Sequence, residues 1–224
     1  MQSSQTQNYT SFPIPAEVRV FQPKTSPLMA KAFTEGQIAA LGRHNVTKIS
    51  SSNSSWWHNP FVRGLVLIDI QTRELLGGVR IHLHSQSHPM PMMPVLQKVF
   101  PEGYQYVHEC SKEPKAEISG IWRSPKAPKA TLARLLTSKA IFVAKELGVK
   151  CLYGFAGHHS VSILEKEGFG YEDVLCKDQK IPYPDDRYQS KVCFLDLNQD
   201  SLFDWAPEVK MIHHGFIAFS GMRA

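Results

Sequence analysis

The sequence predicts an α/β (α+β) fold, a mixed central sheet flanked by helices, and two stretches carry most of that prediction. In the first, residues 132–147 place apolar side chains at helical spacing, as in a helix that lies on a sheet. Gly148 ends this helix as a left-handed cap, and residues 149–155 are β-branched and aromatic, as in a buried strand. With a strand at 117–122 before it, this makes a βαβ unit whose two strands should be parallel and adjacent.

The second stretch is a hairpin formed by residues 64–70 and 75–84 around a turn at 71–74. Alternation places Val79, Ile81 and Leu83 on one side and Arg80, His82 and His84 on the other. His82 and His84 could share a metal ion, but no third ligand stands at an interpretable spacing. We therefore expect a polar sheet face and no metal site.

The chain has 224 residues, which suits a single domain with a sizeable core. We expect a polar tail at 1–16, the domain at 17–200 and a C-terminal extension at 201–224. The extension either packs on the same domain or forms a contact between two copies, as in a homodimer. Further expected elements are a first strand at 17–21, one or two helices at 27–41, a loop at 50–59 and two last strands at 171–178 and 189–197.

Composition narrows the class of partner. The hydrophobic share of 42% and the charged share of 20% are typical of a soluble globular protein. A formal charge of +5 suits an anionic partner, whereas nucleic acid is not favoured because no run of five Lys or Arg occurs. There is no signal peptide, no run of 18 apolar residues and no CxxC pair among the four cysteines. We expect a cytoplasmic protein with reduced thiols and no membrane contact.

The order of elements over residues 116–171 carries a family resemblance. A strand is followed by a loop with a basic residue, a helix that ends in KELGV, a second strand and a short helix that closes in LEKEGF at 164–169. This resembles the coenzyme-A-binding half of the GNAT superfamily of N-acyltransferases, in which a phrase like YEKLGF closes the second helix. The resemblance implies a GNAT-like fold and transfer of an acyl group from a thioester to an amine.

Residues 77–102 narrow the resemblance to one branch of this superfamily. They are similar to a segment of acyl-homoserine-lactone synthases and related N-acyl amino acid synthases, through Gly77, Arg80, Pro89, Met90, Met93, Phe100 and Pro101. That branch continues with a Glu-x-Ser-Arg strand, and here Glu117, Ser119 and Gly120 stand in its place. The final arginine of that motif is absent. Its absence argues against the specific autoinducer chemistry but leaves the predicted scaffold unchanged.

The resemblance also implies where the acyl donor binds. The family holds the pantetheine arm against a splayed strand and the pyrophosphate at the N-terminus of the long helix. The matching residues are Ile121, Trp122, Arg123, Lys126, Lys129, Ala130 and Thr131. Ala130 and Leu132 occupy the two positions where the family keeps glycine, a degenerate loop that also resembles synthases using acyl carrier protein. The alternative is that the basic residues are simply solvated.

For catalysis, Glu117 is the candidate base, with a solvated glutamate as the alternative. The tyrosine that the family often uses as general acid is replaced by Leu164, so Tyr153, Ser119, His158 or His159 would serve, or none is needed. On the substrate side, Trp56 and Trp57 either form a pocket wall or are one core anchor and one half-exposed partner. Arg80 and His82 lie on the hairpin where the family directs the donor toward the acceptor.

The resemblance thus predicts an N-acyltransferase that transfers an acyl group from acetyl-CoA or another acyl-CoA to a small-molecule amine, with acetyl as the first expectation. One alternative is an N-acyl amino acid synthase that resembles the autoinducer synthases and takes its acyl group from acyl carrier protein. The other is a non-catalytic protein that binds acyl thioesters.

Overall fold

The computed structural model describes residues 15–46, 54–109, 113–127, 129–171, 175, 181–184 and 186–198, with the backbone alone at 129–131 and 158–159. Its strands are β1 (Ala16–Phe21), β2 (Val62–Asp69), β3 (Leu75–Leu83), β4 (Lys115–Arg123), β5 (Cys151–Gly157), β6 (Ile181–Pro182) and β7 (Gln189–Asp196). Its α-helices are α1 (Pro27–Gly42), α2 (Met93–Val99), α3 (Pro101–Glu109), α4 (Lys129–Glu146) and α5 (His158–Lys166). Short 3-10 helices are η1 (Pro23–Thr25) and η3 (Ser55–His58).

The seven strands form one mixed sheet in the order β1-β2-β3-β4-β5-β7-β6. β4 and β5 run parallel, and the other neighbouring strands run antiparallel. Because α4 connects β4 to β5, the predicted βαβ unit is confirmed. Gly148 ends α4 with φ of +77°, the left-handed cap that was predicted.

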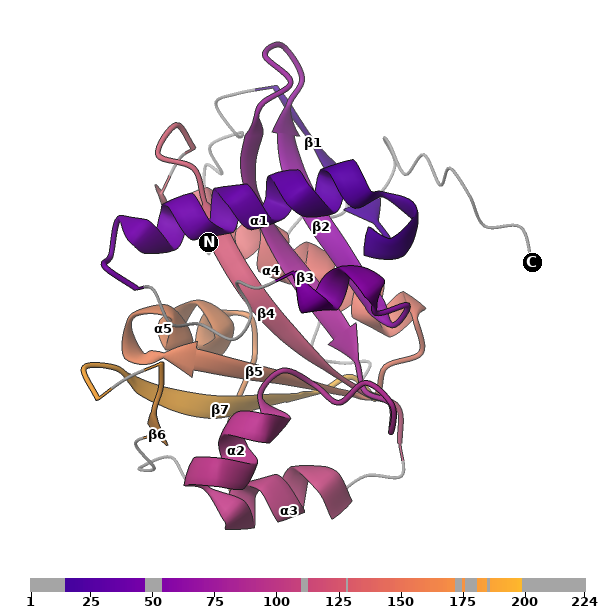
Figure 1. Cartoon of the computed structure of the whole chain (residues 1–224), viewed down its shortest axis with the longest axis vertical. Coiled ribbons are helices and arrows are strands. Elements are labelled where there is room, and N and C mark those ends of the chain that lie inside the picture. The colour runs from indigo at the N-terminus through magenta and orange to yellow at the C-terminus, as the bar shows by residue number, and fades with distance from the viewer. Residues whose placement is uncertain are drawn as a thin grey trace, which may run out of the picture.

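Helices cover both faces of the sheet (Figure 1). α1 crosses the near face in that view, and α4 lies on the far face, while α2 and α3 lie at the lower end beside the end of β3. The stretch at 27–41 is one helix, α1, which passes through Gly36 without a break. A Cβ atom at Gly36 would lie 2.2 Å from the Trp122 ring, so glycine allows the helix to approach the sheet closely.

Three clusters of apolar side chains fill the two sides of the sheet. The α4 and α5 side holds Leu65, Leu67, Val79, Ile81, Ile118, Leu132, Leu136 and Leu152. The α1 side holds Phe33, Trp56, Val62, Val66 and Trp122, continued near α2 by a third cluster with Met90, Met92, Leu96 and Tyr153. The alternation of residues along β3 and β4 decides which cluster each side chain joins.

The first strand, the hairpin and the last strand form where the sequence predicts them, within two residues at each end. α3 and β6 were not predicted. Residues 171–178 lie mostly outside the described residues, and Gly170 forms an isolated bridge to Phe194. The tail at 1–14, residues 50–53 of the predicted loop and the extension at 201–224 also lie outside them.

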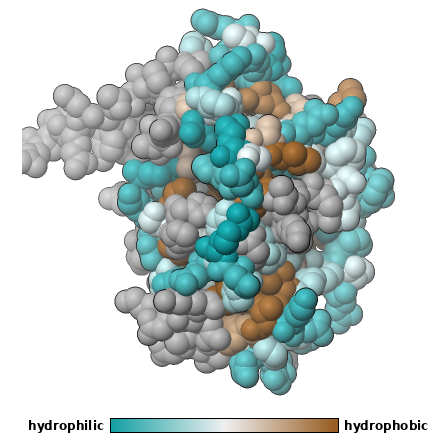
Figure 2. All heavy atoms as spheres, turned by 60° about the vertical axis from the view of Figure 1, so that its left-hand side comes forward, coloured by the Kyte–Doolittle hydropathy of each residue, from teal (hydrophilic) through white to brown (hydrophobic). Residues whose placement is uncertain are grey.

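The described surface carries a few exposed large apolar side chains, two on α1 and the others on different segments: Leu28, Ile38, Val20, Phe61, Ile70 and Val99. Figure 2 shows brown, hydrophobic patches separated by hydrophilic ones over the coloured atoms of one side. Such scattered residues are normal on a folded protein and do not indicate a binding surface. Over the described part of the chain, no helix combines the length and apolar character needed to cross a membrane.

Candidate active site

β4 and β5 separate toward their carboxyl ends. Their ladder joins Lys115–Ile118 to Cys151–Gly154 and then stops. Beyond that point β4 continues to pair with β3, while β5 continues to pair with β7. The two strands therefore lie side by side, as predicted for residues 117–122 and 149–155, and then part.

A β-bulge marks the place where β4 leaves β5. Gly78 faces Trp122 and Arg80 faces Ser119, so β4 uses three steps where β3 uses two. Gly120 supplies the extra residue with φ of +61°, and a Cβ atom there would lie 2.8 Å from Nη2 of Arg80. Glycine is needed here both for the backbone angle and for the close approach of Arg80.

His82, Glu117 and Tyr153 form a polar row across the middle of the sheet. His82 faces Glu117 in the β3–β4 ladder, and Glu117 faces Tyr153 in the β4–β5 ladder, so all three point to the side of α1 and α2. Their exposed fractions are 4%, 3% and 2%. The solvated alternative for Glu117 is therefore wrong, and the polar face predicted for His82 is covered rather than open to water.

The carboxylate of Glu117 is held by the segment that follows β3. The backbone N–H of Met92 donates a hydrogen bond of 2.7 Å to Oε2 of Glu117. Burial raises the pKa of Glu117 to about 8, against the opposing effects of this hydrogen bond and of the nearby Arg80 charge. A base with a pKa near physiological pH is well matched to proton transfer from an amine.

Arg80 is fully buried beside this carboxylate. Its guanidinium carbon lies 4.3 Å from the Trp56 ring centre and 5.4 Å from that of Phe33. Burial lowers the pKa of Arg80 to about 9, an effect that Glu117 opposes. The pKa of His82 lies well below its usual value, first because of burial and then because of the Arg80 charge, so His82 is neutral.

The two tryptophans differ in their surroundings. Trp56 is buried against Arg80 and Phe33. Trp57 is half-buried, and its Nε1 donates a hydrogen bond of 3.1 Å to Oγ1 of Thr34. They are thus one core anchor and one half-exposed partner, and Trp56 also stacks on the charge next to Glu117.

Four buried polar atoms on the α1 side have no hydrogen-bond partner among the described residues. They are Trp56 Nε1, His82 Nε2, Ser119 Oγ and Trp122 Nε1. Buried polar groups are nearly always paired, so such atoms mark positions where a water molecule or a ligand completes the site. Two of the four are indole N–H groups, which can only donate.

The loop before α4 is firmly built. Ser124 donates its N–H to the Leu76 carbonyl at 2.8 Å, and Nη1 of Arg123 donates to the carbonyls of Ser124 and Ala127 at 3.0 and 2.7 Å. Arg123 therefore shapes the loop, while Lys126 points outward and pairs with Glu74. Ile121 and Trp122 pack on opposite faces of the sheet.

The remaining predicted site residues lie at the N-termini of two helices. Lys129, Ala130 and Thr131 begin α4, and His158 and His159 begin α5, but their side chains lie outside the described residues. Sequence reasoning missed the Met92 hydrogen bond and the Trp56–Arg80 contact. Within the described ranges no group of three His, Cys, Asp or Glu side chains is placed to hold a metal ion.

Together, the mixed sheet, the parallel pair that parts and the helix that follows β4 are the fold of the GNAT superfamily of N-acyltransferases. Among solved structures, the N-acyl amino acid synthase FeeM from uncultured soil microbes superposes with a TM-score of 0.65 at 14% identity, over 84% of this chain and 93% of that one. A CoA-dependent acyl-homoserine lactone synthase, BjaI, solved with SAM and isopentyl-CoA, gives 0.59 at 12% identity, over 89% and 88%.

A putative GNAT acetyltransferase from Desulfovibrio desulfuricans gives a TM-score of 0.52 at 10% identity, over 81% of this chain and 98% of that one. No family model matches the sequence, and the search of curated proteins returns no match. At these identities the structural likeness establishes the fold, and the chemistry has to be argued from the residues of this chain.

Proposed function

We propose that the chain is an N-acyltransferase that transfers an acyl group from a coenzyme A thioester to a small-molecule amine, with acetyl as the preferred acyl group. The observation that carries the proposal is the parting of β4 and β5 directly beside the buried carboxylate of Glu117. The gap between the strands would receive the thioester arm. Glu117 then lies at the point where an amine would meet the thioester carbonyl.

The polar row supplies the proton transfers that this reaction needs. Glu117 accepts a proton from the amine nitrogen, directly or through water, as the new C–N bond forms. Tyr153, its register partner on β5, donates a proton to the sulfur as the C–S bond breaks. Neutral His82 lines the substrate side without adding a second positive charge beside Arg80.

The α4 end of the gap suits the anionic part of the donor. The backbone N–H groups of the first turn of a long helix favour phosphate. Arg123 holds the preceding loop in shape, and Lys126 together with Lys129 supplies positive charge. Ala130 and Thr131 of the first turn, and Ile121 with Trp122 of β4, complete the set that we assign to the donor.

One observation favours a second candidate, an N-acyl amino acid synthase, with acyl carrier protein as the alternative donor. The indole N–H groups of Trp56 and Trp122 are buried donors without a partner among the described residues, and the Arg80 charge lies next to Trp56. Such groups would suit a carboxylate near the reacting amine. An amino acid carries both groups.

The proposal places one catalytic domain at 17–200 in the cytoplasm. There the buried thiols of Cys151 and Cys193 would stay reduced. We assign no metal to the reaction.

The test is a thioester-consumption assay on the full chain. Acetyl-CoA, longer acyl-CoAs and the matching acyl carrier protein thioesters are each incubated with a panel of amines that includes amino acids, and released thiol and product mass are followed together. We expect one equivalent of thiol for each N-acylated product. Thermal stabilisation by coenzyme A without turnover on any amine would instead support a non-catalytic thioester-binding protein. Turnover only with acyl carrier protein thioesters would support the second candidate.

A further inference from the structure

An ion pair joins the loop before α4 to the β2–β3 hairpin. Nζ of Lys126 lies 2.7 Å from Oε1 and 2.6 Å from Oε2 of Glu74, so one ammonium contacts both carboxylate oxygens. The two side chains are 66% and 49% exposed. The pair is therefore open to solvent and to any anion that approaches this end of the sheet.

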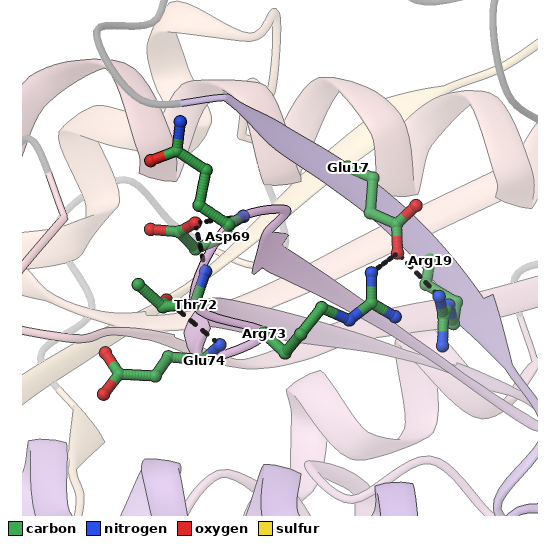
Figure 3. A network of polar contacts seen from close by, with 7 residues as sticks. Glu17, Arg19, Asp69, Thr72, Arg73 and Glu74 are labelled. Atoms are coloured by element: carbon green, nitrogen blue, oxygen red, sulfur yellow. Dashed lines mark hydrogen bonds and ion pairs between the residues drawn. The ribbon is translucent and has the colours of Figure 1, made fainter.

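Glu74 is presented by a well-ordered turn (Figure 3). The Asp69 carboxylate accepts the N–H groups of Gln71 and Thr72 at 2.8 and 3.0 Å, and the Glu74 N–H donates to Oγ1 of Thr72 at 3.4 Å. The hydrogen bond from Thr72 does most to lower the pKa of Asp69, and the charge of Lys126 adds to it. The turn therefore places the Glu74 carboxylate on Lys126 and the Asp69 carboxylate near enough to feel its charge.

Hydrogen bonds within the loop before α4 also fix the backbone at Lys126. The Lys126 N–H donates to Oγ of Ser124 at 3.3 Å, and the Ala127 N–H donates to the Ser124 carbonyl at 3.1 Å. The Ser124 N–H also donates to the Leu76 carbonyl of β3, so a backbone hydrogen bond ties the loop to the hairpin. The exchange of partners at Lys126 needs only a rotation of its flexible side chain.

We propose that Glu74 sets the affinity for the acyl donor, because its carboxylate competes with the donor's phosphate groups for Lys126. This inference rests on the proposed function, which places those phosphates at the N-terminus of α4. In the donor-free protein Glu74 neutralises Lys126. When the donor binds, Lys126 exchanges one carboxylate for a phosphate, and the uncovered Glu74 repels the remaining phosphates.

The proposed competition predicts the direction in which substitution of Glu74 changes the affinity for the donor. Neutralising Glu74 removes both the rival for Lys126 and the repulsion, so the donor should bind more tightly. One unit charge at several ångströms near a protein surface changes such an affinity by about threefold to tenfold. Because the pair is exposed, salt should reduce the effect.

The experiment measures the dissociation constant of coenzyme A by calorimetry at low and high salt for the full chain. The variants are Glu74→Gln, Lys126→Gln and the double variant. Glu17→Gln is the matched control, because Glu17 pairs with Arg19 and Arg73, on the other side of the turn in Figure 3, instead of with Lys126. We expect tighter binding for Glu74→Gln, weaker binding for Lys126→Gln and little change for the control.

The double variant decides the mechanism. Because the competition needs Lys126 but the repulsion does not, adding Glu74→Gln to Lys126→Gln should tighten binding by a smaller factor than Glu74→Gln does in the wild type, and an equal factor would overturn the competition. Equal binding by Glu74→Gln and Glu17→Gln would overturn the inference and leave the proposed function standing. A wild-type protein that does not bind coenzyme A at all would overturn the coenzyme A donor site, and this inference with it.

Discussion

The two faces of the central sheet bury very different side chains. Toward α4 and α5 the strands contribute an apolar layer, with Ile81 from β3, Ile118 from β4 and Leu152 from β5. Toward α1 and α2 the neighbouring positions are Arg80, His82, Glu117 and Tyr153, all less than 5% exposed. The same alternating strands thus build a layer that favours folding on one side and a layer of ionisable groups on the other.

The difference between the two faces means that one mainly stabilises the fold and the other holds the groups proposed for catalysis. Burying apolar side chains stabilises the fold in proportion to the area removed from water. Burying Arg80, His82 and Glu117 costs free energy, which shows in the direction of their pKa shifts. The apolar clusters on both sides of the sheet therefore have to offset the cost of holding Glu117 in a dry environment.

Truncation on the apolar face should have the largest effect on stability. Leu136→Ala, at a fully buried position of α4, should lower the free energy of unfolding by about 2–5 kcal/mol. Its neighbour Leu135 is only partly buried, so Leu135→Ala is a matched control with a smaller cost. Urea denaturation measures both. The rate per folded molecule should stay the same, and a large loss of rate would contradict the separation of the two faces.

Neutralising the polar row should instead affect the reaction. Glu117→Gln keeps the shape and removes the base, so the rate of thioester consumption should fall by about 10²-fold or more. Glu102→Gln neutralises an exposed carboxylate of α3 and serves as the control. The stability of Glu117→Gln at neutral pH should equal or exceed that of the wild type. An unchanged rate would remove Glu117 from the mechanism.

The polar row should also make stability depend on pH. In the unfolded chain Glu117 loses its proton near its ordinary pKa of 4.5, but in the folded chain only near 8. Between these values the folded state holds one more proton, so stability should fall as pH rises, by roughly 5 kcal/mol in total, because each pKa unit corresponds to about 1.4 kcal/mol. His82, whose pKa is lowered, acts in the opposite sense below about pH 6.5.

The measurement is urea unfolding of the wild type and of Glu117→Gln between pH 5.5 and 8.5. The wild type should lose stability relative to the variant across this window. Adding His82→Gln to both proteins removes the opposing titration and serves as the control. Parallel curves for wild type and Glu117→Gln would mean that the carboxyl group titrates as it does in water.

How much the sequence could predict also differs between the two faces. Helical spacing and strand alternation place Leu136, Ile81 and Ile118 correctly, because a periodic apolar pattern needs no knowledge of partners. The same alternation places Glu117 opposite Ile118 but says nothing of what covers it. Its cover comes from the Met92 segment, 25 residues earlier in the chain.

The candidate site was predicted by residue type more than by contacts. Glu117, Tyr153 and His82 were each singled out, and the register brings them into one row. Lys126 was assigned to the donor, but its partner Glu74 lies 52 residues away and has no sequence signal. Such pairs depend on which loops meet at the end of the sheet, a tertiary feature that local patterns do not encode.

Two glycines offer the finest test of the comparison. Gly148 and Gly120 both have positive φ, so alanine at either position should cost about 1 kcal/mol of backbone strain. A Cβ atom at Gly148 would meet nothing within 4 Å, whereas at Gly120 it would meet Arg80. Gly120→Ala should therefore lower the melting temperature further than Gly148→Ala, by about 2–4 °C.

Gly120→Ala should also slow the reaction, because it displaces the guanidinium that packs over the Trp56 and Phe33 rings and supports ionised Glu117. Gly148→Ala should leave the rate of the folded protein unchanged. Equal effects of the two variants on stability and on rate would mean that Arg80 adapts freely, in which case the polar side of the sheet is not packed tightly enough to fix the base.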